Sequence, residues 1–215
     1  MTKDGSHTLY LPDLDETYHS THGALQEAEY IFIAKGLVYL AENKNAIRIL
    51  EIGFGTGLNA ILTLSKAVEL TTKVEYTTLE PYPLEHSLIE KLNYLSFLDK
   101  LGVENFDTLH TCDWEKNHIF NPFFNFKKQQ TRLQDLNLEN ESFDLIYYDA
   151  FAPSRQADIW ELENIQKCYD SLRQKGVLIS YCASGQFKRN LKEVGFELEA
   201  LAGPPGKREI TRAIK

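Results

Sequence analysis

Three glycines at alternate positions mark the stretch of this chain that is best suited to hold a ligand. An apolar β-type run ends at Ile52, and Gly53, Gly55 and Gly57 follow before the helix-favouring LNAILTLSKAVEL. Glycine is used where the backbone takes a positive φ, or where a ligand approaches closer than a Cβ allows. The helix after the turn would direct its unpaired N–H groups at whatever lies above it. This order predicts a strand, a sharp turn and a helix, with a nucleotide-type crevice over the turn.

Two acidic residues narrow the kind of ligand. Glu51 precedes the first glycine by two positions, and Glu80 ends the next β-like run, VEYTTLE, where an acid can hold a ribose diol. The turn lacks the Lys-Ser/Thr pair of a P-loop and is one residue shorter than the dinucleotide fingerprint. The pattern E-x-G-x-G-x-G followed by such an acid is typical of class I S-adenosylmethionine methyltransferases. We therefore predict S-adenosyl-L-methionine as cofactor, and a purely structural turn is the alternative.

A third acid follows another apolar strand. The run FDLIYYD (143 to 149) is apolar nearly throughout, as expected of a central parallel strand, and Asp149 ends it before AFAP. Its carboxylate would face the same crevice, where it could orient an amine and assist loss of its proton during methyl transfer. The alternative is a turn or helix-cap carboxylate. Phe151 and Pro153 would line the slot for a planar base or the cofactor.

Composition limits the class of protein. A length of 215 residues suits one substantial α/β domain, and no apolar run approaches the ~20 residues of a membrane helix. The N-terminus has no apolar signal segment, and three widely spaced cysteines without CxxC suggest a reducing compartment, so we predict a cytoplasmic protein without membrane association. His19 and His22 have no matching third ligand, so no metal is predicted. A net charge of −8 argues against non-specific coating of nucleic acid.

The remaining pattern predicts a mostly parallel sheet of about seven strands with right-handed crossovers and a C-terminal antiparallel hairpin. Residues 1–45 would form a hairpin and a helix that pack on a Rossmann-like core of residues 46–215. Ser20 or Thr21 is expected to cap the first helix, Asp158 a later one, and Gly176 to end it. The expected elements are a hairpin over 8–19, helices over 24–43, 58–70, 84–99, 159–174 and 184–194, strands over 74–79, 143–149, 177–182, 196–201 and 208–214, and an irregular β-hairpin over 107–128.

The tight loop GPPGKRE joins the last two strands and carries Lys207 and Arg208. Basic side chains at this edge of the sheet could hold a nucleic-acid phosphate. They could equally pair with Glu209 or face solvent.

The combination of EIGFGTGLN, LEPYPL, DAFAP with a tryptophan downstream, and GPPGKRE is more specific than any one motif. Together with ETYHSTHGALQEAEYIF near the N-terminus, it resembles the tRNA 5-methylaminomethyl-2-thiouridine methyltransferase family over nearly the whole chain. This family is known as MnmD when freestanding and as the methyltransferase half of bifunctional MnmC. The resemblance implies methylation, by S-adenosyl-L-methionine, of the exocyclic amine of 5-aminomethyl-(2-thio)uridine at the wobble position, with the tRNA anticodon loop as partner.

The resemblance also implies roles for residues. Glu80 looks like the ribose acid, Asp149 the catalytic acid beside the target amine, and Glu27 and Tyr30 match a run that closes over the site. The expected substrate-binding residues are Glu27, Tyr30, Phe151, Pro153, Lys207 and Arg208. The expected cofactor-binding residues are Glu51, Gly53, Phe54, Gly55, Thr56, Gly57, Asn59, Glu80, Pro81, Gln130, Thr131 and Asp149.

Two departures from the family pattern change what we expect for the source of the substrate and for the contacts to adenine. The FAD-dependent oxidase half is absent, so a separate enzyme would supply the aminomethyl-uridine. The family's acidic residue near adenine is replaced by KKQQTRL, so Gln130 or Thr131, or else Asp113, would contact the base. The alternative functions are methylation of a small-molecule or protein amine, and a non-enzymatic S-adenosylmethionine-binding module.

Overall fold

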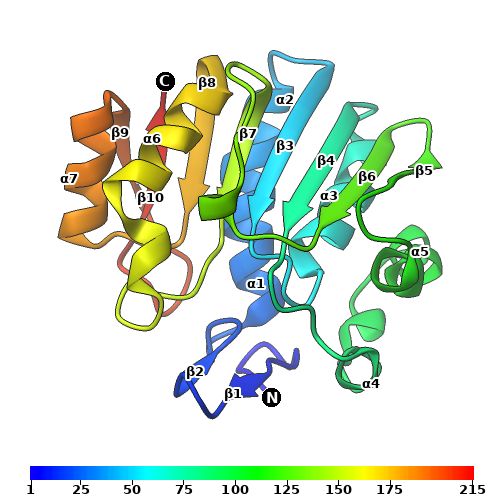
Figure 1. The fold of residues 1–215 in the computed structure, drawn as a ribbon. Helices are drawn as coiled ribbons and strands as arrows, with labels where there is room; N and C mark the ends of the chain where they lie inside the picture. The colour runs from blue at the N-terminus through cyan, green and yellow to red at the C-terminus, as the bar shows by residue number, and fades with distance from the viewer.

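A computed structural model describes all residues, 1–215, and its centre is one eight-stranded sheet (Figure 1). The strands lie in the order β5-β6-β4-β3-β7-β8-β10-β9, and a separate two-stranded sheet pairs β1 with β2. The strand bounds are β1 Tyr10–Leu11, β2 Glu16–Thr17, β3 Ala46–Ile52, β4 Lys73–Leu79, β5 Asn117–Asn121, β6 Phe124–Gln129, β7 Phe143–Tyr148, β8 Leu172–Ser180, β9 Glu197–Ala202 and β10 Glu209–Ile214.

The five strands from β6 to β8 in this order are parallel, whereas β5, β10 and β9 pair antiparallel with their neighbours. The predicted α/β class and the C-terminal antiparallel hairpin are therefore confirmed. The predicted count of seven strands is wrong by one, because Asn117–Asn121 adds to the edge of the sheet beside β6. The carboxyl ends of the parallel strands point toward the β1–β2 hairpin, at the bottom of Figure 1.

Helices cover both faces of the sheet, as a parallel sheet requires. Ile49 of β3 packs into a core with Leu64 of α3, and the next residue, Leu50, packs into a second core with Ile165 of α6. Figure 1 accordingly shows α2 and α3 on one side and α6 and α7 on the other. The helices are α1 Ala24–Ala28, the π-helix η1 Glu29–Val38, α2 Tyr39–Ala41, α3 Leu58–Glu69, α4 His86–Ile89, α5 Lys100–Thr111, α6 Leu162–Ser171, α7 Gly185–Val194, and the 3-10 turns η2 Tyr94–Ser96, η3 Leu133–Asp135 and η4 Ala157–Trp160.

Two predicted elements between β4 and β6 are wrong. The helix expected over 84–99 is only the short α4 and η2, because the Asn93 side chain accepts from His7 N and donates to Gly5 O, which ties this stretch to the N-terminal segment. Residues 107–111, expected to be extended, belong to helix α5. Phe106 and Leu109 are buried on one face of that helix, which has the three-residue spacing of a helix rather than alternation.

Three predicted helix boundaries are also wrong. The first amides of α1 are bound by Asp4 and Ser6 rather than by Ser20 or Thr21, because the N-terminal segment folds back over this helix. Asp158 lies in η4, and α6 begins after Glu161 and ends at Ser171. Gly176, expected to end that helix, lies within β8.

The predicted helix after Ser184 is confirmed. The Ser184 side chain accepts from Phe187 N, and Gly195 ends the helix with a φ of 109°. None of the helices combines the length and the apolar character that crossing a membrane requires.

Candidate active site

A cavity of about 850 Å³ opens at the carboxyl ends of β3, β4 and β7. Its floor contains Gly53, Glu80 and Asp149, which come from three different strand ends. Residues 131–134 line one part of the wall, and the N-terminal segment with the β9–β10 loop lines another. Of the acids and glycines singled out in the sequence, Gly53, Gly55, Glu80 and Asp149 line this one cavity. Glu51 and Gly57 do not.

The glycine turn has the left-handed backbone that its sequence predicted. Gly53 has a φ of 95°, and a Cβ there would lie 2.7 Å from the main-chain oxygen of Asp149. A side chain at this position would therefore separate the ends of β3 and β7. Gly57 has a φ of 72° and starts α3 from beneath the cavity, next to His110.

Glu80 is held by backbone amides on both carboxylate oxygens. Gly55 N donates to Oε2 at 3.0 Å, and Tyr82 N donates to Oε1 at 2.9 Å. Burial raises the pKa of Glu80 above its ordinary range, and the amides of Gly55, Tyr82 and Phe54 oppose that rise. The carboxylate is thereby oriented beside the turn without a counter-charge, which leaves it available to a ligand hydroxyl.

Asp149 lies opposite the turn. Its Oδ2 accepts from Asn59 Nδ2 at 2.8 Å, so the first turn of α3 orients the carboxylate. Burial first, and then the negative charge of Glu27, raise the pKa of Asp149 to about 7, while the bond from Asn59 and the charge of Lys207 oppose this. A carboxylate with a pKa near neutrality can both accept and release a proton.

Glu51 lies beneath the turn and does not line the cavity. Thr78 Oγ1 donates to its Oε2 at 2.7 Å, whereas Oε1 is buried without a hydrogen-bond partner. Burial raises the pKa of Glu51 to about 8, so the carboxyl group is protonated near neutral pH. Its role is to bind Thr78 inside the protein rather than to contact a ligand. Phe54, Thr56 and Pro81, by contrast, line the cavity.

The residues beyond β6 differ in their positions. Thr131 lines the cavity, whereas Gln130 lies outside it and its N–H donates to Glu115 Oε1 at 2.9 Å. Asp113 is at the surface, paired with Lys116 at 2.7 Å.

Gln134 lines the cavity but is not among the residues predicted from the sequence. Its Nε2 donates to Asp158 Oδ2 at 2.9 Å, and its Oε1 is buried without a partner. A polar side chain just past the carboxyl end of β6 is the signal that could have identified it.

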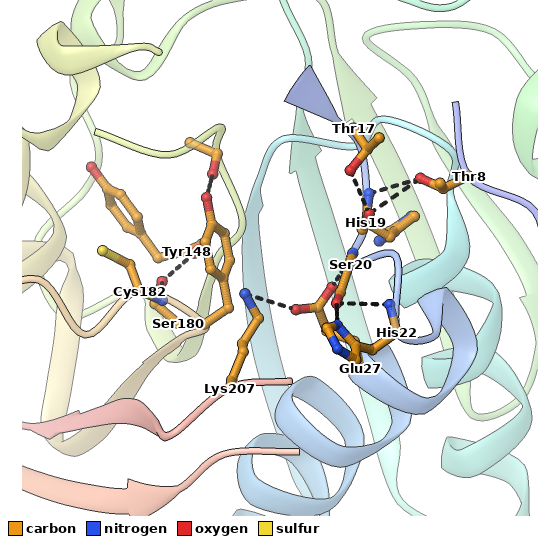
Figure 2. A network of polar contacts seen from close by, with 12 residues as sticks. Thr8, Thr17, His19, Ser20, His22, Glu27, Tyr148, Ser180, Cys182 and Lys207 are labelled. Atoms are coloured by element: carbon orange, nitrogen blue, oxygen red, sulfur yellow. Dashed lines mark hydrogen bonds and ion pairs between the residues drawn. The ribbon is translucent and has the colours of Figure 1, made fainter. Parts of the chain in front are cut away.

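The predicted substrate residues also divide into two groups. Glu27, Phe151 and Lys207 line the cavity, and Figure 2 shows Lys207 reaching Glu27. Tyr30, Pro153 and Arg208 do not line it, and the Tyr30 hydroxyl instead donates to Ala202 O at 3.0 Å.

Three tyrosines that were not singled out in the sequence line the cavity, namely Tyr18, Tyr82 and Tyr181. The ring of Tyr18 meets Phe151 edge-on, with 5.0 Å between centroids, and the Tyr181 hydroxyl donates to Ala150 O at 2.8 Å. His19 and His22, considered as metal ligands, bond instead to Thr56 and Ser20, respectively.

The cavity fits an adenosyl sulfonium cofactor. Its volume is in the usual range for small-ligand sites, ~300–1,000 Å³. The left-handed glycines allow close approach, Glu80 offers carboxylate oxygens to a ribose, and the unpartnered Gln134 Oε1 offers an acceptor to a base.

The chain resembles known methyltransferases in sequence and in fold. Residues 123–215 match the model of a family described as S-adenosyl-L-methionine-dependent methyltransferase. The chain superimposes on the crystal structure of MNMC2 from Aquifex aeolicus with a TM-score of 0.81 and 25% identity, covering 99% of this chain and 68% of that one. It is 28% identical over 224 residues to an uncharacterised protein of Methanocaldococcus jannaschii, covering all of this chain and 58% of that protein.

A second curated relative is the tRNA 5-methylaminomethyl-2-thiouridine biosynthesis bifunctional protein MnmC of Cupriavidus metallidurans. It is 28% identical over 227 residues, covering 99% of this chain and 33% of that protein. The chain therefore spans between about a third and three-fifths of the length of these curated relatives. The fold is that of class I S-adenosylmethionine-dependent methyltransferase structures. In sequence, the chain is similar to MnmC proteins, at 25–28% identity over most of its length.

Proposed function

We propose that this protein transfers a methyl group from S-adenosyl-L-methionine to the exocyclic amine of 5-aminomethyl-(2-thio)uridine at the wobble position of tRNA. The observation that carries the proposal is the Asp149 carboxylate, held by Asn59 in the same cavity as the glycine turn and Glu80. The similarity to proteins named for tRNA 5-methylaminomethyl-2-thiouridine biosynthesis supports the choice of substrate.

The cofactor would lie along the floor of the cavity. Backbone groups of the turn at Gly53 to Thr56 would contact its amino-acid part, Glu80 its ribose hydroxyls, and Gln134 its adenine. When bound, the cofactor supplies a methyl group on a positively charged sulfur. Phe54 and Pro81 are the apolar groups that would exclude water beside it.

Asp149 would act on the amine. Its carboxylate accepts a hydrogen bond from the amine nitrogen and so directs the lone pair toward the methyl carbon. When nitrogen accepts the methyl group and the cofactor's sulfur keeps the bonding electrons, positive charge would build on nitrogen, and Asp149 would take up the proton that nitrogen sheds. A pKa of about 7 lets Asp149 return this proton to solvent in the next step.

The substrate imposes two further requirements. The proposed substrate already carries the aminomethyl group, which a separate enzyme would place on the uridine. The tRNA loop would approach from the β9–β10 side, where Lys207 and Arg208 follow the Pro204–Pro205 turn. A tRNA substrate would place the reaction in the cytoplasm. Residues 1–215 would act as one domain.

Nucleoside analysis of wobble uridines tests the proposal. Cells lacking the protein should accumulate the unmethylated amine, and adding the purified protein with S-adenosyl-L-methionine to their bulk tRNA should restore the methylated nucleoside. An unaltered nucleoside profile would contradict the proposal.

The net charge of −8 favours one competing function, methylation of a small-molecule or protein amine. The salt dependence of transfer separates the two functions. Phosphate contacts make the KM for tRNA rise steeply with salt, whereas a small amine shows little dependence.

A further inference from the structure

Lys207 and Glu27 form an ion pair inside the cavity wall. Lys207 Nζ lies 3.1 Å from Glu27 Oε1, with exposed side-chain fractions of 25% and 9%. The other oxygen of Glu27, Oε2, accepts from Ser20 N at 2.8 Å, so the backbone of the N-terminal segment orients the carboxylate (Figure 2). Lys207 thus turns its charge inward, although it comes from a loop at the edge of the sheet.

An aromatic face completes the surroundings of this ammonium. Lys207 Nζ lies 4.4 Å from the centroid of the Tyr181 ring. The hydroxyl of Tyr181 is bound to Ala150 O, which holds the ring next to the loop that follows Asp149. Carboxylate and aromatic face together are the groups that recognise alkylammonium ligands in proteins.

The head group of lysine is itself a primary alkylammonium. The protonated aminomethyl group of the proposed substrate has the same charge, the same three N–H donors and the same CH₂ attachment. Glu27, Tyr181, Lys207 and Asp149 all line the one cavity, and the charges of Glu27 and Lys207 both act on Asp149, so the position that Lys207 now fills adjoins the proposed place of the amine.

We propose that Glu27 and Tyr181 form a receiving subsite for the substrate's alkylammonium group, and that Lys207 occupies this subsite as an internal stand-in until the substrate displaces it. This inference rests on the proposed function and names the group within the substrate that the wall of the cavity selects. Displacement exchanges one ammonium for another, so the carboxylate of Glu27 stays paired throughout. Once released, Lys207 would lie next to Arg208, and the ammonium of Lys207 would pair with a phosphate of the tRNA.

The test compares two nucleosides of nearly equal size, 5-aminomethyluridine, which is cationic, and 5-hydroxymethyluridine, which is neutral. Their dissociation constants are measured at pH 7 by calorimetry, with S-adenosyl-L-homocysteine present. Wild-type protein should bind the cationic nucleoside more tightly. Lys207→Met keeps the chain length but removes the competing charge, and should increase this preference about tenfold, because Glu27 is left for the ligand alone.

Two further substitutions should act in the opposite direction. Glu27→Gln retains an acceptor for Ser20 N but removes the charge, and should reduce the preference about tenfold. Tyr181→Leu should reduce it by a smaller factor, whereas Tyr181→Phe, which retains the aromatic face, should not. Lys188→Met serves as the matched control, since Lys188 has a similar exposed fraction, 26%, and pairs with Glu209 outside the cavity; it should leave the preference unchanged.

An unchanged or reduced preference in Lys207→Met, or a wild-type protein that does not distinguish the two nucleosides, would overturn the subsite. Methylation of tRNA by the wild-type protein is measured separately. If the wobble amine is methylated while the preferences do not respond, the subsite is wrong and the proposed function stands. If the preferences respond while no wobble uridine is methylated, the subsite stands and the proposed function is wrong.

Discussion

Asn59 and Asp149 are joined by a hydrogen bond of 2.8 Å from Nδ2 to Oδ2, which connects the first turn of α3 to the end of β7. The same helix follows the glycine turn, so α3 and the end of β7 together hold the carboxylate beside the turn. The predictions below follow from this arrangement.

Asp149→Asn should reduce kcat about 10²- to 10⁴-fold, the usual contribution of a positioned acid or base. Its amide oxygen can still accept from Asn59, so the dissociation constant for S-adenosyl-L-methionine should change less than about threefold. Single-turnover methyl transfer and calorimetry provide the two numbers. Asp170→Asn, at a half-buried acid outside the cavity that accepts from Gln166, is the control and should behave as wild type. Retention of wild-type turnover in Asp149→Asn would remove the catalytic role.

The pH dependence of kcat/KM should show an acidic limb near pH 7. The pKa of Asp149 is raised to about 7 by burial, and the carboxylate accepts a proton only when it is ionised. The rate should therefore increase with pH up to this value and then level off. Asp149→Asn should lack the limb, and an identical limb in both proteins would assign it to another group.

Glu51→Gln should make the protein's stability less dependent on pH. Burial raises the folded-state pKa from 4.5 to about 8, so between these values the folded protein holds a proton that the unfolded chain has lost. The free energy of unfolding of the wild type then falls as pH rises through this window, by up to about 1.4 kcal/mol per pH unit from this group. Urea titrations at pH 5, 7 and 8.5 measure the slope. A slope in Glu51→Gln as steep as that of the wild type would show that Glu51 titrates normally.

Gly53→Ala should lower both stability and cofactor affinity. The new Cβ would lie 2.7 Å from Asp149 O at a φ of 95°, so the ends of two strands must separate, at a cost of about 1–3 kcal/mol. Gly185→Ala is the matched control, because the nearest atom is the flexible end of Arg189 at 3.3 Å and the position is helical. Thermal unfolding with and without S-adenosyl-L-methionine tests both, and equal behaviour of the two variants would argue against close packing at the turn.

Gln134→Ala should raise the dissociation constant for S-adenosyl-L-methionine about tenfold, the value of one hydrogen bond of about 1.4 kcal/mol. Asp113→Ala and Gln130→Ala should leave it unchanged, since both residues lie outside the cavity. Calorimetry of the three variants shows which of these side chains binds the adenine of the cofactor. A loss of affinity confined to Asp113→Ala would reverse this assignment.

The centre of the fold could be predicted from local sequence, whereas its periphery could not. The strand and helix on either side of Gly53 were predictable because their apolar pattern and the glycines are contiguous in the chain. Helix α5 was not, since burial of Phe106 and Leu109 depends on distant partners. The break between α4 and η2 likewise depends on Asn93 meeting residues near the N-terminus, some 86 positions away.

The candidate site follows the same division. Strand-end acids such as Glu80 and Asp149 share a cavity because parallel strands bring their carboxyl ends together, which the alternation of strands and helices predicts. Gln134 and Tyr181 could not be selected, because their positions depend on the path of the loop after β6 and on the packing at the end of β8. Tyr30 belongs to a sequence motif that resembles the family, but its hydroxyl donates to Ala202 O of β9 rather than facing the cavity.

The N-terminal segment takes part in two structures at once. Asp4 and Ser6 bind the amides at the start of α1, and residues 11 to 21 of the same segment form a wall of the cavity. The N-terminal segment is therefore a strap that covers both the start of α1 and one side of the cavity. Any movement that admitted a large substrate by lifting this strap would also expose the beginning of α1, so opening and local unfolding would be a single event.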